Sequence, residues 1–150
     1  MPSPYSERNP NNYLGYLSAL GSGATGPQTA NATNASPVVL TGTFQTIAIL
    51  AKTLGQGNRV NITGQLVGTN TSPGVDAELH IQVLQDGVPI SPDVISAMPT
   101  TGDAATTSWT VFALVPSAGT HSYTVQAKAT GDGGITIAAN DGLLNFSAAP

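Results

Sequence analysis

The stretch Ser108–Ala129, SWTVFALVPSAGTHSYTVQAKA, decides the fold class of this chain. Apolar residues recur at every second position on both sides of its centre, and this period of two is typical of β-strands. Between the two runs lies Pro116-Ser117-Ala118-Gly119. Proline presets φ and glycine tolerates positive φ, so we expect a tight turn there. The stretch therefore predicts a β-hairpin with one face turned toward a core.

The two predicted strands differ on their second face. The later strand has Thr124, Gln126 and Lys128 there, as expected for a sheet with one face in water. The earlier strand has Phe112 and Leu114 instead, so both of its faces require cover. We expect this cover to come from another subunit, with Phe112 and Leu114 at an oligomer interface. The alternative is cover from a loop or from the N-terminal arm of the same chain.

Residues 37–150 continue the pattern of short apolar runs separated by turn signals. Asp86-Gly87 is the strongest hairpin signal, because a type I′ turn requires positive φ at both central residues. Turns are also predicted at 132–134 and 140–142, and Ser91–Thr107 is expected to be a long excursion between strands. This segment thus predicts an all-β domain, a β-sandwich or jelly roll of about eight antiparallel strands.

Residues 1–36 are expected to form an extended N-terminal arm that ends in a flexible linker over 21–36. Within the arm, apolar residues at i, i+3, i+4 and i+7 predict one short helix at about residues 13–20. Two helical turns are not stable alone in water, so this stripe needs a surface. We favour a neighbouring protein over one end of the chain's own sandwich. The residues expected to bind that partner are Tyr5, Tyr13, Leu14, Tyr16, Leu17 and Leu20.

The composition limits the classes of function. Charged residues make up 8% of the chain and the net charge is −4, whereas about 25% charged residues is typical of soluble domains. So little charge fits a surface covered by neighbours, and four scattered cations form no basic patch for nucleic acid. No apolar run approaches the ~20 residues of a membrane span. The first residues lack the apolar core of a signal peptide, so we expect synthesis in a cytosol.

Few side chains are suited to catalysis or to metal binding. The chain has two histidines, no cysteine and no GxSxG motif, so we expect no enzyme activity, no metal and no cofactor. The strongest candidate is Asp76-x-Glu78-x-His80, whose side chains share one face of a predicted strand. Alternate residues of a strand lie roughly 7 Å apart, which is far for ligands of one ion. We therefore interpret these residues as a solvated face or a polar interface.

The arm, the Tyr13-Leu14-x-Tyr16-Leu17 stripe and the cysteine-free, low-charge β-domain together resemble the decoration (cement) proteins of tailed-bacteriophage capsids. The segments VLQDGVPI and FALVPSAGTHSYTVQAKATGDGGITI also resemble trimeric jelly rolls of the tumour-necrosis-factor and C1q kind. The resemblance implies a structural virion protein that is made in the host cytoplasm and binds the outer capsid surface. Its expected partners are the major capsid protein and further copies of itself in a homotrimer. The alternative is a head-fibre or receptor-binding module that recognises host glycans.

Overall fold

The computed structural model describes residues 27–72, 76–99, 102–131 and 134–150. These residues form eleven β-strands and no helix, so no segment among them is a helix able to span a membrane. The predicted helix at about 13–20 lies outside the described residues. The strands are β1 (Gln28–Thr33), β2 (Val38–Leu40), β3 (Gln45–Leu54), β4 (Arg59–Asn70), β5 (Ala77–Gln85), β6 (Val88–Pro89), β7 (Val94–Met98), β8 (Ala104–Leu114), β9 (Gly119–Gly131), β10 (Ile135–Ile137) and β11 (Gly142–Ala149).

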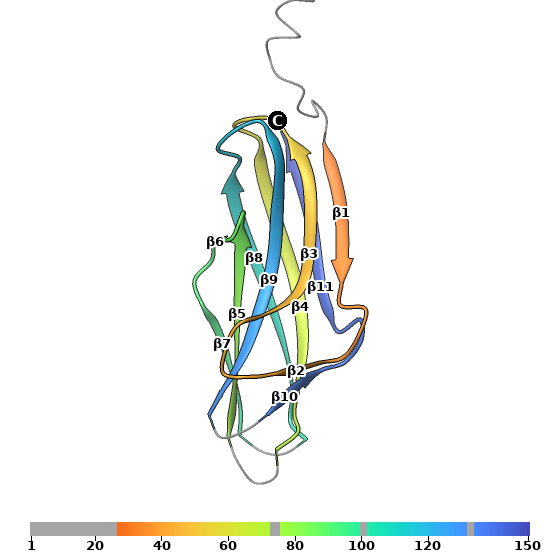
Figure 1. The fold of residues 1–150 in the computed structure, drawn as a ribbon, viewed down its shortest axis with the longest axis vertical. Coiled ribbons are helices and arrows are strands. Elements are labelled where there is room, and N and C mark those ends of the chain that lie inside the picture. Colours follow the sequence, from red (N-terminus) through yellow and green to blue (C-terminus); the bar gives the residue numbers. More distant parts are fainter. Residues whose placement is uncertain (1–26, 73–75, 100–101, 132–133) are drawn as a thin grey trace, which may run out of the picture.

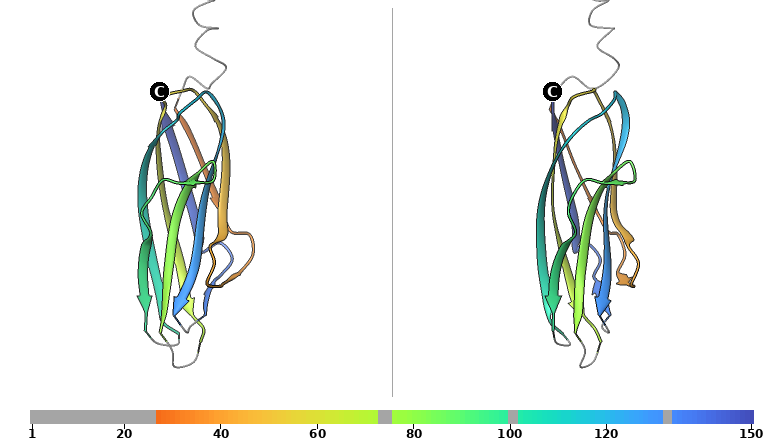
Figure 2. Two further views of the ribbon diagram at one scale, coloured as in Figure 1. Left: turned by 60° about the vertical axis from the view of Figure 1, so that its left-hand side comes forward. Right: turned by 90° about the vertical axis from the view of Figure 1, so that its left-hand side faces the viewer.

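The strands pair into two antiparallel sheets that stack along a common long axis (Figures 1 and 2). The first, which we call the β4 sheet, has the order β1-β11-β4-β10-β2, and β8 pairs with the other edge of β4. The second, the β9 sheet, has the order β3-β9-β5-β6, and β7 also pairs with β5. This arrangement confirms an antiparallel all-β sandwich.

Alternation along β4 explains why this strand is central to its sheet. Val60, Ile62 and Leu66 are buried on its inner face, while the residues between them point outward. The inner face meets β9, from which Tyr123 reaches across to Phe146 of β11 with ring centroids 5.0 Å apart. These contacts bury apolar side chains from both sheets in a single core.

A glycine in β4 makes room for the largest side chain of that core. Trp109 of β8 lies opposite Gly64 in the register of the two strands. A Cβ atom at Gly64 would overlap the indole ring of Trp109. The absence of a side chain at this position therefore lets the ring lie flat over β4.

The predicted hairpin over Ser108–Ala129 is wrong. β8 pairs with β4 and β9 pairs with β3 and β5, so the two runs lie in different sheets. The segment around Pro116 carries the chain from one layer to the other at one end of the sandwich (Figure 1). The predicted buried faces of the two strands agree with the structure. A period of two determines which side chains are buried, but it does not determine which strand is the partner.

Other local predictions had mixed outcomes. Asp86 and Gly87 have φ of 52° and 81° and join β5 to β6 as a hairpin, as predicted. The excursion over Ser91–Thr107 contains β7 and the first residues of β8. β1 lies in the part of the chain expected to be linker, and it pairs with β11 over its whole length. The β-domain therefore includes residues before 37.

Candidate functional site

The strand registers place two rows of side chains on the outward side of the β4 sheet. They lie at the end of the sheet where β1 begins, and Figure 1 shows the strands at this end. In the first row, Phe112 of β8 and Ser147 of β11 flank Asn61 of β4, and Thr29 of β1 lies beside Ser147. In the second row, Leu114 and Ala149 flank Arg59. We call this surface the Phe112 face; it comprises Thr29, Arg59, Asn61, Phe112, Leu114, Ser147 and Ala149.

Phe112 and Leu114 are the most exposed large apolar side chains of the Phe112 face. Their exposed fractions are 76% and 65%, so no described residue covers them. They are exposed because they occupy outward positions of β8, whose inward positions hold Trp109 and Val111. An aromatic and an aliphatic side chain on one strand face form an apolar patch that water solvates poorly.

Two hollows adjoin Phe112, and both are lined by Arg59 and Val60 as well. The smaller, of about 220 Å³, extends toward Ala113 and Leu114. The larger, of about 440 Å³, extends to the start of β1 and the end of β11. The Phe112 face is thus uneven, with a protruding ring between two concave regions that a complementary surface can fill.

The polar groups of the Phe112 face carry almost no charge. Among the outward residues of β1, β4, β8 and β11, only Arg59 is charged, and it has no ion pair within the described part of the chain. The buried Oδ1 atom of Asn61 also has no hydrogen-bond donor there. Depletion of charge with retention of an aromatic and an arginine is the composition of protein interface cores.

The residues predicted to bind a partner through the arm lie outside the described residues, as do all of positions 1–26. The chain enters the described domain at Pro27, and Pro27 and Gln28 line the larger hollow. The first described residues of the chain therefore lie next to the Phe112 face.

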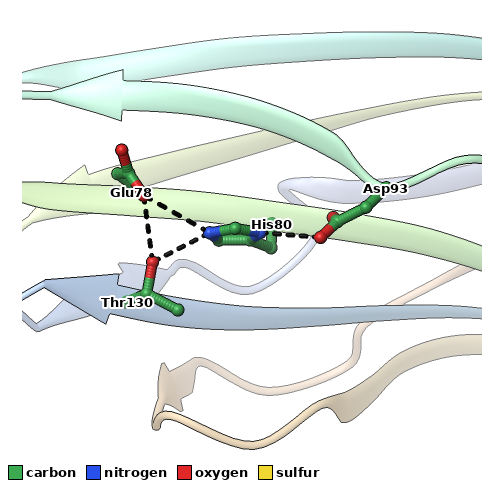
Figure 3. Close-up of polar contacts among 4 residues, drawn as sticks. All are labelled: Glu78, His80, Asp93 and Thr130. Carbon is green, nitrogen blue, oxygen red and sulfur yellow. Dashed lines mark hydrogen bonds and ion pairs between the residues drawn. The ribbon is translucent and has the colours of Figure 1, made fainter.

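The structure does not place the three residues of the Asp76-x-Glu78-x-His80 pattern on one solvated strand face. Figure 3 shows the contacts that Glu78 and His80 make with Asp93 and Thr130. His80 is buried on the outer side of the β9 sheet, where its Nδ1 lies 2.8 Å from Asp93 Oδ2. Its Nε2 lies 2.8 Å from Thr130 Oγ1 and 3.5 Å from Glu78 Oε2. Asp76 precedes β5 and is exposed, and none of these contacts includes it.

The contacts of His80 have the order of a catalytic triad, hydroxyl to imidazole to carboxylate. Thr130 and Asp93 come from β9 and from the residue before β7, so no local sequence motif marks them. A hydrolase also requires donors for an oxyanion and a pocket for the substrate. Both hollows described above lie on the other sheet. The absence of enzyme activity stays a prediction.

The second histidine has a structural role at the end of the sandwich where β9 begins. His121 Nδ1 lies 2.6 Å from Asp86 Oδ2, and its Nε2 lies 2.8 Å from the Ser117 carbonyl oxygen. Both partners are acceptors, so both ring nitrogens donate and the imidazole is cationic. His121 thereby joins the β5–β6 turn to the segment that links the two sheets.

Within this pair the pKa of His121 is raised and the pKa of Asp86 is lowered. The hydrogen bond to Asp86 raises the pKa of His121 above 6.5; burial opposes this, while the Ser117 carbonyl and the Asp86 charge add to it. Burial by itself would raise the pKa of Asp86. Hydrogen bonds from His121 and the Ser122 N–H, with the His121 charge, outweigh burial and hold that pKa below 3.8.

Comparisons with known proteins add information on the fold alone. No family model and no curated protein sequence matches this chain. Among solved structures, the chain is similar to Eiger TNF from S. frugiperda, with a TM-score of 0.51 and 4% identity over 83% of this chain and 94% of that one. The VP2 subviral particle of infectious bursal disease virus has a TM-score of 0.44 and 11% identity over 82% of this chain and 37% of that one. Dimeric latent PorU from Porphyromonas gingivalis has a TM-score of 0.48 and 9% identity over 85% of this chain and 13% of that one.

At 4% identity, the similarity to Eiger TNF shows a shared β-sandwich fold and nothing about partners. The surfaces of this chain therefore carry the evidence about its function.

Proposed function

We propose that this protein is a structural virion protein that decorates and stabilises a phage capsid. In this proposal a homotrimer forms through the Phe112 face, and the part of the arm that precedes β1 reaches the major capsid protein or a neighbouring trimer. The protein would be made in the host cytoplasm and added to the outer surface of the shell.

The observation that carries the proposal is the exposure of Phe112 and Leu114 on a sheet face with a single charge. A freely diffusing protein gains solubility from surface charge, and this chain has only 8% charged residues. Both properties are explained when the face is covered by other protein molecules. The jelly-roll resemblance and the β-sandwich of the structure agree with this class of protein.

The stabilising effect would come from many weak attachments. A contact of standard size buries about 800 Å² on each partner, and a trimer presents three such contacts at once. Linked contacts bind more tightly than any one of them, because the second and third are intramolecular. A trimer with three arms would therefore raise the free energy needed to separate neighbouring capsomers.

Co-sedimentation with shells tests the proposal. The shells are assembled from the major capsid protein of the same genome without this protein, and the bound fraction is measured against added protein. We expect saturable binding by the full chain and its loss after deletion of residues 1–21, with the far-UV spectrum of the β-domain unchanged. Binding of the deletion variant with unchanged affinity would contradict the role of the arm.

Glycan recognition has less support from the structure. A glycan site generally combines several exposed aromatic rings in a shallow groove. Among the described residues Phe112 is exposed, Phe44 is half-buried, and Trp109, Tyr123 and Phe146 belong to the core. We therefore do not propose it as the function.

A further inference from the structure

We propose that the larger hollow of the Phe112 face receives the Phe112 ring of a second copy of this chain, and that Arg59 is the residue that recognises this ring. The contact rests on the homotrimer of the proposed function, whose copies it would hold together. It involves no capsid protein, so its test is separate from the test of capsid binding.

The larger hollow has the size and the lining that an aromatic ring requires. Its volume is about 440 Å³, its lining is mostly apolar, and its walls come from β1, β4, β8 and β11. A closed apolar cavity of roughly 150 Å³ already binds benzene. The smaller hollow has walls from β4 and β8 alone. The larger hollow is therefore the one with wall residues on several sides of an inserted ring.

Arg59 favours a ring over a carboxylate as the group that enters the hollow. Arg59 lines the hollow and has no ion pair within the described ranges of the chain. A carboxylate would have to leave water for a mostly apolar lining, which costs free energy. An aromatic ring buries apolar area there and also offers its π-face to the guanidinium group.

Phe112 is the aromatic side chain that a second copy can supply. It is 76% exposed, whereas the other described aromatic side chains are half-buried or belong to the core. The half-buried one, Phe44, already lies under Lys128, whose ammonium group is 4.7 Å from the ring centre. Within the described part of the chain, Phe112 is thus the ring available to fill a hollow of another copy.

The charge on the Phe112 face gives a second reason for this contact. When copies meet through the same face, their Arg59 side chains come near one another, and like charges repel. A guanidinium group that lies against a ring of the next copy gains an attractive partner in exchange. One contact therefore covers the exposed ring and offsets the repulsion between the arginines.

The positions of ring and hollow allow a closed assembly. Phe112 lies on β8, and Ser147 and Thr29, which line the hollow, lie in the same row on β11 and β1. Ring and hollow are thus side by side across the strands. A symmetry axis that runs along the strands between them lets each copy insert its ring into one neighbour and receive the ring of another, which closes the assembly.

Isotope-filtered NMR of the full chain tests the contact. Copies labelled with ¹³C are mixed with unlabelled copies, and cross-peaks between protons of different copies are recorded. We expect cross-peaks from the Phe112 ring to Arg59 and to the Ala149 methyl group, which line the hollow. A trimer without these cross-peaks, or with cross-peaks from Tyr13 or Tyr16 to the hollow instead, would overturn the contact alone. A protein that stays monomeric in this sample would overturn the homotrimer as well, whereas co-sedimentation with shells tests capsid binding.

Substitutions test the role of Arg59 in sedimentation velocity. Arg59→Gln should raise the dissociation constant of the assembly about tenfold, because the guanidinium group no longer lies against a ring. Lys52→Gln, which removes a cation from the β9 sheet, should leave it unchanged. In a Phe112→Leu chain, which lacks the π-face, Arg59→Gln should have no further effect. Tighter association of Arg59→Gln, an equal loss in Lys52→Gln, or the same loss in the Phe112→Leu chain would refute recognition of the ring by Arg59.

Discussion

Replacement of Phe112 by serine should weaken association strongly and lower the free energy of unfolding only slightly. The ring is 76% exposed in the single chain, and a phenylalanine presents about 200 Å². Burial of the exposed part, about 150 Å², contributes about 4 kcal/mol to association at about 25 cal/mol per Å². The part already buried within the chain, about 50 Å², contributes only about 1 kcal/mol to folding.

Sedimentation velocity across a concentration series measures the first quantity, and urea unfolding of the dissociated protein measures the second. We expect Phe112→Ser to raise the dissociation constant about a thousandfold and to lower the free energy of unfolding by about 1 kcal/mol. Ile49→Ser is the matched control, because Ile49 is 60% exposed on the other sheet. Equal effects of the two substitutions on association, or no effect of Phe112→Ser, would refute the assignment of the interface.

Two further predictions concern the fold. Gly64→Ala should lower the free energy of unfolding by about 1–3 kcal/mol, because the new methyl group overlaps Trp109. Gly42→Ala, where a Cβ atom meets nothing within 4 Å, is its control in thermal melts, and equal melting temperatures would contradict the packing described. The His121–Asp86 pair should stabilise the protein most between pH 3.8 and pH 6.5, the ordinary pKa values of its two groups, and less beyond them as pH approaches the lowered pKa of Asp86 or the raised pKa of His121. The stabilisation that comes from protonated His121 is complete below pH 6.5 and is lost as pH rises through the raised pKa of His121. Asp86→Asn should therefore lower the free energy of unfolding at pH 6 and lower it progressively less at higher pH. A constant difference across that range in urea unfolding would contradict the ion pair.

The buried faces of the strands were predictable from the sequence, whereas their partners were not. The alternation around Trp109 and Tyr123 correctly predicted which side chains face the core. The same alternation is compatible with a hairpin and with two strands in opposite layers. Only the whole set of pairings decides between them, because each strand needs a partner on both edges or a position at the edge of a sheet.

Turn residues predicted a turn correctly where its backbone conformation allows few residue pairs. Asp86-Gly87 requires positive φ at two consecutive residues, a conformation that few other pairs adopt, and the hairpin followed. β7 was missed because Val94–Met98 is a short run between two prolines, which are typical of loops. β1 was missed because its residues have low strand propensity and gain their order from pairing with β11.

The two candidate sites also differ in how far the sequence predicts them. The exposure of Phe112 and Leu114 follows from their alternation with Trp109 and Val111 within one strand. The contacts of His80 do not follow from alternation within one strand, since Asp93 and Thr130 are 13 and 50 residues away from His80 in the chain. Register between strands brings these groups together, and a single sequence contains no direct signal of register.

Labelling of single cysteines tests the central claim, that other protein covers the Phe112 side of the β4 sheet. The chain has no cysteine, so Thr110→Cys on that side and Ile49→Cys on the β9 sheet each give one reactive thiol. Both positions are exposed in the single chain. We predict that the native assembly reacts with a thiol reagent much more slowly at position 110 than at position 49, and equally at both once dissociated. Equal labelling rates in the assembly would contradict the account.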